Sequence, residues 1–360
     1  MALGSTAYVP ILKARQAEIK ALLKSPAGLE PTPLFELQRA AAASVDRVTG
    51  EIRRRKSTAT DASYFIDDVA RLWDAPLYID VARVAAPGER GTWWSLLKLI
   101  NDLAPEPVEL MPVLHLDDNP SDTAAAAGIA ATTGRAAVRI FMEQVRSTPT
   151  VVGGVTTSIA GALGLPATAI DAVLDWGDRT EGFSLDDLES DTVSVINNLG
   201  PHGAVITAGT PNSEAFVQVG DWRPLRREWL LWLRLAHAGH SVVFGDYALY
   251  PPSDPVPARP QYGHLRYSSG DRLYVHRRAM PSGGGGLAGA FKTCCEHVVS
   301  HTHWLGGAFS GADGRIEDIT LDADKESSAG GWRQIAAEHH FHLVAEQLTS
   351  PPPAPPPGTP

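Results

Sequence analysis

The chain lacks the long apolar runs and the cysteine frameworks that would place a protein in a membrane or in a disulfide-bonded class. No run of about eighteen apolar residues occurs, so we predict no membrane-spanning helix. The only two cysteines, Cys294 and Cys295, are neighbours in the sequence, and neighbouring cysteines rarely form an ordinary disulfide. The first residues contain no basic region followed by an apolar stretch. These absences together predict a soluble, cytoplasmic protein.

Short signatures of common chemistries are also missing. The sequence has no G-x-x-x-x-G-K-[ST] phosphate-binding loop and no G-x-S-x-G nucleophile motif. The glycine run at 283–286 is not followed by a lysine, and we interpret it as a flexible loop. No single motif therefore names a reaction.

Charge limits the range of partners. The chain has 31 Lys and Arg residues against 41 Asp and Glu residues, a net charge of −10. An acidic chain has no general electrostatic attraction for nucleic acid, and we do not expect it to bind one. The densest basic run, Arg53–Lys56, lies in a polar stretch and is interpreted as a solvated loop, with a focused basic face as the alternative.

The residues that are present show a repeated alternation. Short runs rich in β-branched residues alternate about eight times with amphipathic helical stretches, which predicts an α/β fold of the (β/α)8 TIM-barrel type. The predicted strands are 8–13, 33–37, 77–81, 108–115, 136–141, 172–175, 204–208 and 241–246. The predicted helices are 15–24, 58–73, 91–103, 121–133, 155–170, 186–199 and 228–238.

The pattern changes after residue 250. A hairpin around 268–271, a helix at 287–300 and a short amphipathic segment at 332–348 predict a C-terminal extension near the barrel mouth. We therefore expect one domain, 1–349, with a barrel core at about 8–250 and an extension at about 251–349. Residues 350–360 form a proline-rich tail that we expect to be disordered. This tail could dock a protein partner, with a plain solvated end as the alternative.

Ionisable residues lie at the ends of most predicted strands. The C-terminal ends of barrel strands converge on one mouth, so these residues should form a cluster there. Buried charges must be paired or coordinated. The cluster is therefore either a ligand site or a mutually neutralising network, and its members are Lys13, Glu36, Asp80, His115 with Asp117, Arg139, Asp175 and Asp246.

Two chemistries fit these residue types. The carboxylates of Glu36, Asp80, Asp175 and Asp246 suit a divalent cation such as Mg²⁺, with Lys13, Arg139 and Arg266 holding a phosphate, which would allow phosphoester hydrolysis. Alternatively, two of the carboxylates act as general acid and base without a metal. The sequence gives no distances between these groups, so it leaves both schemes open.

The sequence contains two groups of closely spaced histidines. His297, His301 and His303 contain a pair spaced for one helix face, and His339, His340 and His342 form a second group. Neither matches H-E-x-x-H, and a zinc site would need third and fourth ligands from elsewhere, so we assign no metal ligands. We expect His339 and His340 to face the mouth as polar or proton-transfer groups.

Several short motifs, taken in order, resemble those of the beta family, which is named after a bacteriophage beta protein. They are Tyr8–Glu18, Pro33–Glu36, Phe244–Tyr247, His264–Tyr267, and Trp332-Arg-Gln followed by His339-His340. The resemblance implies a barrel-like domain and a phage or phage-defence setting, but no reaction. The residues of this chain that match the family's motifs are Lys13, Gln16, Glu18, Glu36, Asp246, Tyr247, Arg266, Tyr267, Trp332, Arg333, His339 and His340. The chain departs from the family pattern at Ser327–Gly331 and at His276–Arg278.

The predicted site contains residues from the charged strand ends and from the family motifs. The candidate catalytic residues are Glu36, Asp80, Asp175, Asp246 and His340, and the candidate ligand-binding residues are Lys13, Arg139, Tyr247, Arg266, Arg333 and His339. The leading hypothesis is a phage- or defence-associated protein whose mouth binds a small anionic, phosphorylated ligand. If it is an enzyme, we expect a hydrolase of phosphoesters. The alternative is a non-catalytic binding or assembly protein whose mouth charges are structural.

Overall fold

A closed barrel of parallel strands forms the larger part of the molecule. The structure, a computed structural model, describes residues 3, 7–38, 44–45, 52–53, 62–63, 65–66, 69, 73–211, 218–250, 262–282 and 284–358. The barrel strands pair in sequence order, and β11 closes on β1. They are β1 (Tyr8–Lys13), β2 (Leu34–Glu36), β5 (Leu77–Asp80), β6 (Leu110–His115), β7 (Ala136–Phe141), β8 (Ile170–Asp175), β9 (Val205–Ala208) and β11 (Val242–Asp246). The predicted (β/α)8 fold is confirmed, and each predicted strand overlaps one of these.

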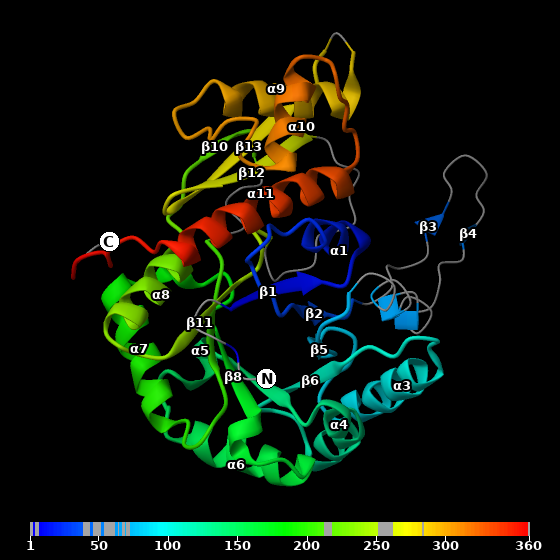
Figure 1. Ribbon diagram of the computed structural model, residues 1–360, viewed down its shortest axis with the longest axis vertical. Coiled ribbons are helices and arrows are strands. Elements are labelled where there is room, and N and C mark those ends of the chain that lie inside the picture. The colour runs from blue at the N-terminus through cyan, green and yellow to red at the C-terminus, as the bar shows by residue number, and fades with distance from the viewer. Residues whose placement is uncertain are drawn as a thin grey trace.

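Helices surround the barrel (Figure 1). They are α1 (Gln16–Leu22), α3 (Arg90–Leu103), α4 (Pro120–Thr133), the short α5 (Met142–Val145), α6 (Val151–Leu163), α7 (Leu185–Asn198) and α8 (Arg227–His237). The predicted range 155–170 was wrong at both ends. Gly164 ends α6 in a left-handed conformation, with φ of 69°, because glycine has no Cβ to clash there. The predicted helix 58–73 falls largely outside the described residues.

Alternation along the strands divides the core into two layers. Val9 and Ile11 of β1 point into the barrel, whereas Tyr8 and Leu12 point outward to the helices. The same period of two recurs in the other strands, since successive strand side chains face opposite sides. The parity of each strand therefore decides which of its last residues enters the mouth.

A second layer lies over one end of the barrel (Figure 1). It consists of an antiparallel sheet in the order β10, β13, β12, covered by two helices. Strands β12 and β13 are the predicted hairpin, but β10 and α10 were not predicted from the sequence. The elements are β10 (Gly220–Trp222), β12 (Tyr262–Ser269), β13 (Arg272–Ala279), α9 (Gly286–Val299) and α10 (Gly311–Thr320).

The last helix, α11 (Ala329–Thr349), returns to the barrel (Figure 1). It packs against α1, and Phe341 meets the ring of Tyr8 edge-on with centroids 6.0 Å apart. Its other side faces the extension, where Trp332 stacks on Phe291 of α9. The segment predicted at 332–348 is thus a longer helix buried between two layers, which explains why apolar and polar residues on several of its faces are buried.

Two segments lie at the periphery of the molecule. Strands β3 (Ser44–Val45) and β4 (Ile52–Arg53) form a small hairpin, and most of the basic run at 53–56 lies outside the described residues. The tail at 351–358 lies along α8, where the carbonyl of Pro356 accepts from Arg234 and that of Pro352 lies 3.3 Å from His237 Nε2. None of the helices in the described part of the chain has both the length and the apolar character needed to cross a bilayer.

Candidate functional site

Six of the predicted mouth residues converge inside the C-terminal end of the barrel. Each lies near the end of its strand, two positions after a core residue that faces into the barrel. Because side chains two positions apart on a strand face the same side, each of these residues also faces inward. All are almost completely buried. We call this set, with Tyr247 from the turn after β11, the mouth network: Lys13, Glu36, Asp80, His115, Arg139, Asp175 and Tyr247.

Arg139 is the centre of the mouth network. Its Nη1 donates to Glu36 at 2.9 Å and to Asp80 at 2.7 Å. Its Nε donates to Oδ2 of Asp175 at 2.8 Å, and its Nη2 donates to the Tyr247 hydroxyl at 2.6 Å. One guanidinium group therefore joins three carboxylates that come from three different strands.

Further contacts neutralise the remaining charge. His115 Nε2 lies 3.0 Å from Oδ1 of Asp80, and Arg83 donates to the second oxygen of Glu36 at 2.6 Å. Burial alone would raise the pKa of Asp80, but His115 and Arg139 outweigh it and the pKa is lowered. The anionic form of Asp80 is thus favoured by its neighbours. These same contacts occupy the oxygens that Mg²⁺ would need, so the donor set does not fit a metal at this point.

Asp246 does not join the mouth network. It has the opposite parity in β11 and points outward, toward α11. Its Oδ1 accepts from the Tyr8 hydroxyl at 2.6 Å, and its Oδ2 lies 2.5 Å from Nε2 of His340. Burial lowers the pKa of His340 despite the neighbouring carboxylate. This group connects the first strand of the barrel, the last strand of the barrel and the helix α11.

His339 lies in the extension and not at the mouth. Its Nδ1 is 2.9 Å from Oδ2 of Asp313, and its Nε2 is 2.7 Å from the carbonyl oxygen of Ser268. Its ring stacks on Tyr267, with centroids 3.8 Å apart. Both ring nitrogens and one ring face are therefore engaged in packing of the extension.

The turn after β11 connects the mouth to the extension. Ala248 and Leu249 both have positive φ, 44° and 70°, which is strained for residues with a Cβ. The turn is held by Ala248, whose N–H donates to Oδ1 of Asp246 at 2.9 Å, and by Leu249, whose carbonyl accepts from Arg266. It directs Tyr247 into the mouth network and carries Tyr250 into the extension.

A second polar site lies where the extension meets the barrel. A cavity of about 170 Å³ opens between the turn, β12, β13 and the start of α11. We call it the interface cleft, and the residues that define it are Tyr250, Tyr262, His264, Arg277, Trp332 and Arg333. Two guanidinium groups lie over the Tyr250 ring, Arg266 at 5.0 Å and Arg333 at 4.4 Å.

The interface cleft has an excess of positive charge. Arg277 and Arg333 line the cleft, and Arg266 lies behind it, over the Tyr250 ring. Arg266 is 6% exposed, and within the described part of the chain it makes no ion pair with a carboxylate. Burial and the neighbouring Arg333 and Arg277 lower its pKa to about 10. Burial, followed by Arg266, Arg277 and Arg333, also lowers the pKa of His264. Cations that disfavour one another's charge in a buried space form a site that an anion would stabilise.

Glu18 of α1 lies beside the cleft residue Arg333, and Lys13 lies in the mouth network, where it is the register partner of Glu36. Glu18 Oε1 is 3.4 Å from Nη1 of Arg333, while its Oε2 is buried and has no hydrogen-bond partner among the residues that the structure describes. Burial raises the pKa of Glu18 to about 7 even though Arg333, Arg15 and Lys13 oppose the shift. Burial lowers the pKa of Lys13 to about 8, with Glu36 opposing and three arginines reinforcing the shift. Both groups therefore titrate near neutral pH.

The residues of the cleft differ in how far they could be predicted from the sequence. Glu18 is among the positions of the family resemblance, but it did not enter the predicted site because it lies in a helix and not at a strand end. Tyr250 and Tyr262 lie in no motif, and His264 begins a family motif but was not assigned to the site, so only the packing of the extension brings these three residues to the cleft. Asp117 is about half exposed and pairs with Arg90, outside the mouth network.

A larger cavity, about 480 Å³, lies at the opposite end of the barrel. Its wall includes Trp73, Tyr78, Met111 and Arg135, and Tyr78 and Arg135 both bind Asp171 at the start of β8. The N-terminal face of such barrels contributes to stability, whereas ligands bind at the C-terminal face. We therefore place the candidate site at the mouth and the interface cleft despite the smaller volume there.

The fold and the site define a (β/α)8 barrel whose mouth is filled by a charge network and flanked by a basic cleft. The chain belongs to the Beta protein family, whose model matches residues 8–346. The predicted resemblance is therefore confirmed over nearly the whole chain. No curated protein matches it.

Solved structures with a similar arrangement are distant. A Burkholderia cenocepacia J2315 protein, described provisionally as a lyase/mutase, is 15% identical, with 68% of this chain and 77% of that chain covered and a TM-score of 0.35. PhdJ bound to a substrate intermediate is 10% identical, with 67% and 66% covered and a TM-score of 0.29. The Bacillus cereus spore cortex-lytic enzyme SleL is 10% identical, with 69% and 72% covered and a TM-score of 0.30.

Proposed function

We propose that this protein binds a small anionic, phosphorylated ligand in the interface cleft. The observation that carries the proposal is Arg266, a buried guanidinium that, like Arg333, lies over the Tyr250 ring at the cleft and has no carboxylate partner among the described residues. Buried charges are costly unless they are paired, and a phosphate would supply the missing counter-charge. The aromatic walls of Tyr250 and Tyr262 suit the non-phosphate part of such a ligand.

The mouth network has a different role in this proposal. Arg139 and the three carboxylates satisfy one another, which supports the alternative of a structural salt-bridge network for this part of the predicted site. The network fixes the end of β11 through Tyr247 and so fixes the strained turn that carries Tyr250. Structural charges at the mouth and ligand-binding charges in the cleft therefore coexist.

A second candidate function is hydrolysis of a phosphoester bound in the cleft. Glu18 favours it, because a carboxyl group with a pKa of about 7 can donate a proton to a leaving group at neutral pH. We also propose a cytoplasmic location and the phage or phage-defence setting that the family resemblance implies. A protein partner for the proline-rich tail stays a prediction.

A thermal-shift and calorimetric screen tests the proposal. The purified protein is titrated with nucleotides, sugar phosphates and inorganic phosphate, and a ligand at about 100 times its dissociation constant should stabilise it by roughly 2.7 kcal/mol. Arg333→Gln and Arg266→Met should each abolish the shift. Arg272→Gln is the matched control, because it removes a cation from the same sheet but lies half-exposed outside the cleft.

Two results would contradict the proposal. One is the absence of any anion that binds, and the other is equal binding by the wild type and Arg333→Gln. Phosphate release is then measured for each ligand that binds, with and without Mg²⁺. Loss of release in Glu18→Gln with retained binding supports hydrolysis, whereas no release from the wild type restricts the function to binding.

A further inference from the structure

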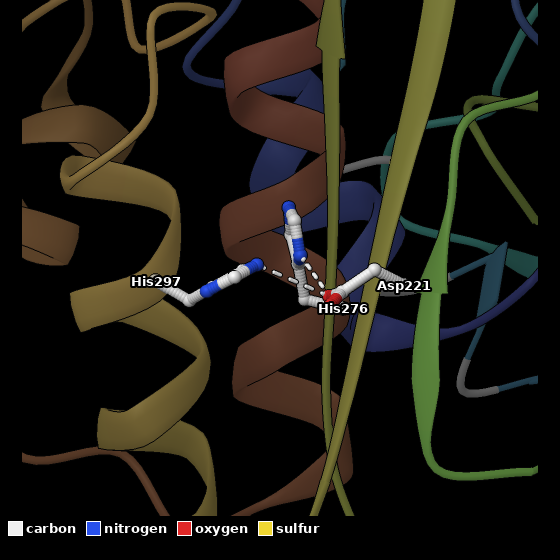
Figure 2. A group of neighbouring side chains, drawn as sticks. All are labelled: Asp221, His276 and His297. Atoms are coloured by element: carbon white, nitrogen blue, oxygen red, sulfur yellow. Dashed lines mark hydrogen bonds and ion pairs between the residues drawn. The ribbon is translucent and has the colours of Figure 1, made fainter.

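A group of histidines gathers on the other face of the extension sheet. His276 follows the alternation of β13, so it faces α9, whereas its neighbour Arg277 faces the interface cleft. Asp221 of β10 is the cross-strand partner of His276. His297 reaches the same point from α9, one layer above the sheet (Figure 2).

The three side chains converge on one point. Oδ1 of Asp221 lies 2.7 Å from Nδ1 of His276 and 3.3 Å from Nε2 of His297. Figure 2 shows both imidazole rings directed toward the Asp221 carboxylate, and both contacts are to its Oδ1. One oxygen and two nitrogens that could serve as ligand atoms lie within 4.8 Å of one another. This arrangement comes from three separate elements and not from one local motif.

Two more histidines border the group. His301 lies just beyond the end of α9, and its ring centroid is 4.1 Å from that of His297. His303 lies parallel to His276 with centroids 5.7 Å apart. The Nε2 atoms of His276 and His303 are both buried without a hydrogen-bond partner in the structure. Such unpartnered buried nitrogens are uncommon, since most buried polar atoms are hydrogen-bonded.

We propose that Asp221, His276 and His297 bind a divalent transition metal ion of the zinc type, with His301 within reach as a fourth ligand. Imidazole nitrogens and one carboxylate oxygen are ligands that zinc commonly takes, in a tetrahedral set. The helical pair His297 and His301 was visible in the sequence, but its partners were not. The fold supplies them from β10 and β13. The site joins the edge strand β10 to the helix layer and is separate from the proposed anion function.

Arg278 opposes metal binding and gives the proposal a distinguishing feature. Its Nη2 donates to both oxygens of Asp221, at 2.9 and 3.0 Å. An incoming cation must displace at least one of these contacts. Removal of this arginine should therefore tighten metal binding, whereas it would loosen an arrangement of hydrogen bonds that has no metal function.

The test uses the full chain, produced without a histidine tag and stripped with a chelator. Zn²⁺ titration by calorimetry should show one ion per chain, and Co²⁺ should give the visible absorption of a tetrahedral site. The melting temperature should rise with Zn²⁺. Asp221→Asn and His297→Ala should each weaken Zn²⁺ binding at least tenfold, and Arg278→Met should strengthen it. His202→Ala is the control, since His202 lies in an exposed turn before β9.

The proposal fails if the wild-type chain binds no stoichiometric Zn²⁺ and shows no Co²⁺ absorption. This outcome does not depend on whether any variant folds. It also fails if Asp221→Asn and His297→Ala, with circular dichroism like that of the wild type, bind Zn²⁺ as tightly as His202→Ala does.

Discussion

The Nε of Arg139 donates to Oδ2 of Asp175 at 2.8 Å, and the same carboxylate oxygen accepts from the Tyr247 hydroxyl at 2.6 Å. A cation from β7, an anion from β8 and a phenol from the turn after β11 therefore share one buried point. Two further carboxylates complete the set around Arg139. Arg139 therefore contacts all three carboxylates of the mouth network.

Arg139→Met should destabilise the protein strongly. The change leaves Glu36, Asp80 and Asp175 buried without their common cation, and breaking a buried ion pair in this way costs about 3–5 kcal/mol. Urea denaturation followed by circular dichroism measures the loss. Arg179→Met, at a side chain that is 64% exposed, should change stability by less than about 1 kcal/mol. Similar values for both variants would refute a structural role for the network.

Glu228→Gln should alter the pH dependence of stability. Burial raises the pKa of Glu228 to about 8, although Arg226 opposes the shift. The folded state then binds more protons than the unfolded state between about pH 4.5 and pH 8, so stability falls as pH rises through this range. The glutamine stays neutral, so the variant should gain up to roughly 4 kcal/mol relative to the wild type at pH 8 and much less at pH 5.

Chemical denaturation at several pH values measures this difference. The exposed Glu296→Gln serves as the control and should leave the pH profile unchanged. A constant difference between Glu228→Gln and the wild type across the range would show that Glu228 is ionised in the folded protein throughout.

Glu18→Gln should change how anion binding depends on pH. Above a pKa of about 7 Glu18 becomes negative, and above about 8 Lys13 loses its charge. Both changes disfavour an anion, so affinity should fall between pH 6 and pH 9, by roughly tenfold for each charge. A sulfate ester is the suitable probe, because its own charge stays fixed. In Glu18→Gln only the later step should persist, and an unaltered profile would place the anion away from Glu18.

Gly263→Ala should displace α9 from the sheet. A Cβ at this position would lie 2.3 Å from the carbonyl carbon and 2.4 Å from the oxygen of Ala290, which are helix backbone atoms. Overpacking of this kind costs about 1–3 kcal/mol or more. Gly154→Ala in α6 is the matched control, because its added methyl group meets nothing within 4 Å and should stabilise the helix slightly. Thermal melting of both variants shows whether the effects have opposite signs.

Most of the barrel could be predicted from the sequence. Strand runs such as Leu77–Asp80 are short, apolar and bounded by charged or turn residues, and this local pattern is sufficient to locate a buried parallel strand. Elements at the edge of a sheet were not predicted, because they lack this pattern. β10 has only three residues, with Asp221 exposed toward solvent, so it lacks the apolar run that identifies a strand.

The candidate site was predictable only in part. Strand-end position correctly brought Glu36, Asp80, Arg139 and Asp175 together, because parity and parallel pairing fix that geometry. Asp246 was wrongly predicted to lie in the mouth cluster. It lies one residue away from an inward-facing position of β11, so its side chain points to the opposite face of the strand. The positions of His339 and His340 depend on α11, which faces the barrel on one side and the extension on the other.

The repeating strand and helix pattern, the charged ends of the strands and the family could all be predicted from the amino-acid sequence alone. These properties are local, or follow from a periodicity that a few neighbouring residues express. Tertiary packing was needed to show that Arg139 contacts three carboxylates, that Arg266 is buried with no carboxylate partner among the described residues, and that Asp221 and His276 meet His297. Those outcomes depend on the path of the chain between residues as distant as 18 and 333, and no local pattern encodes a distance of that kind.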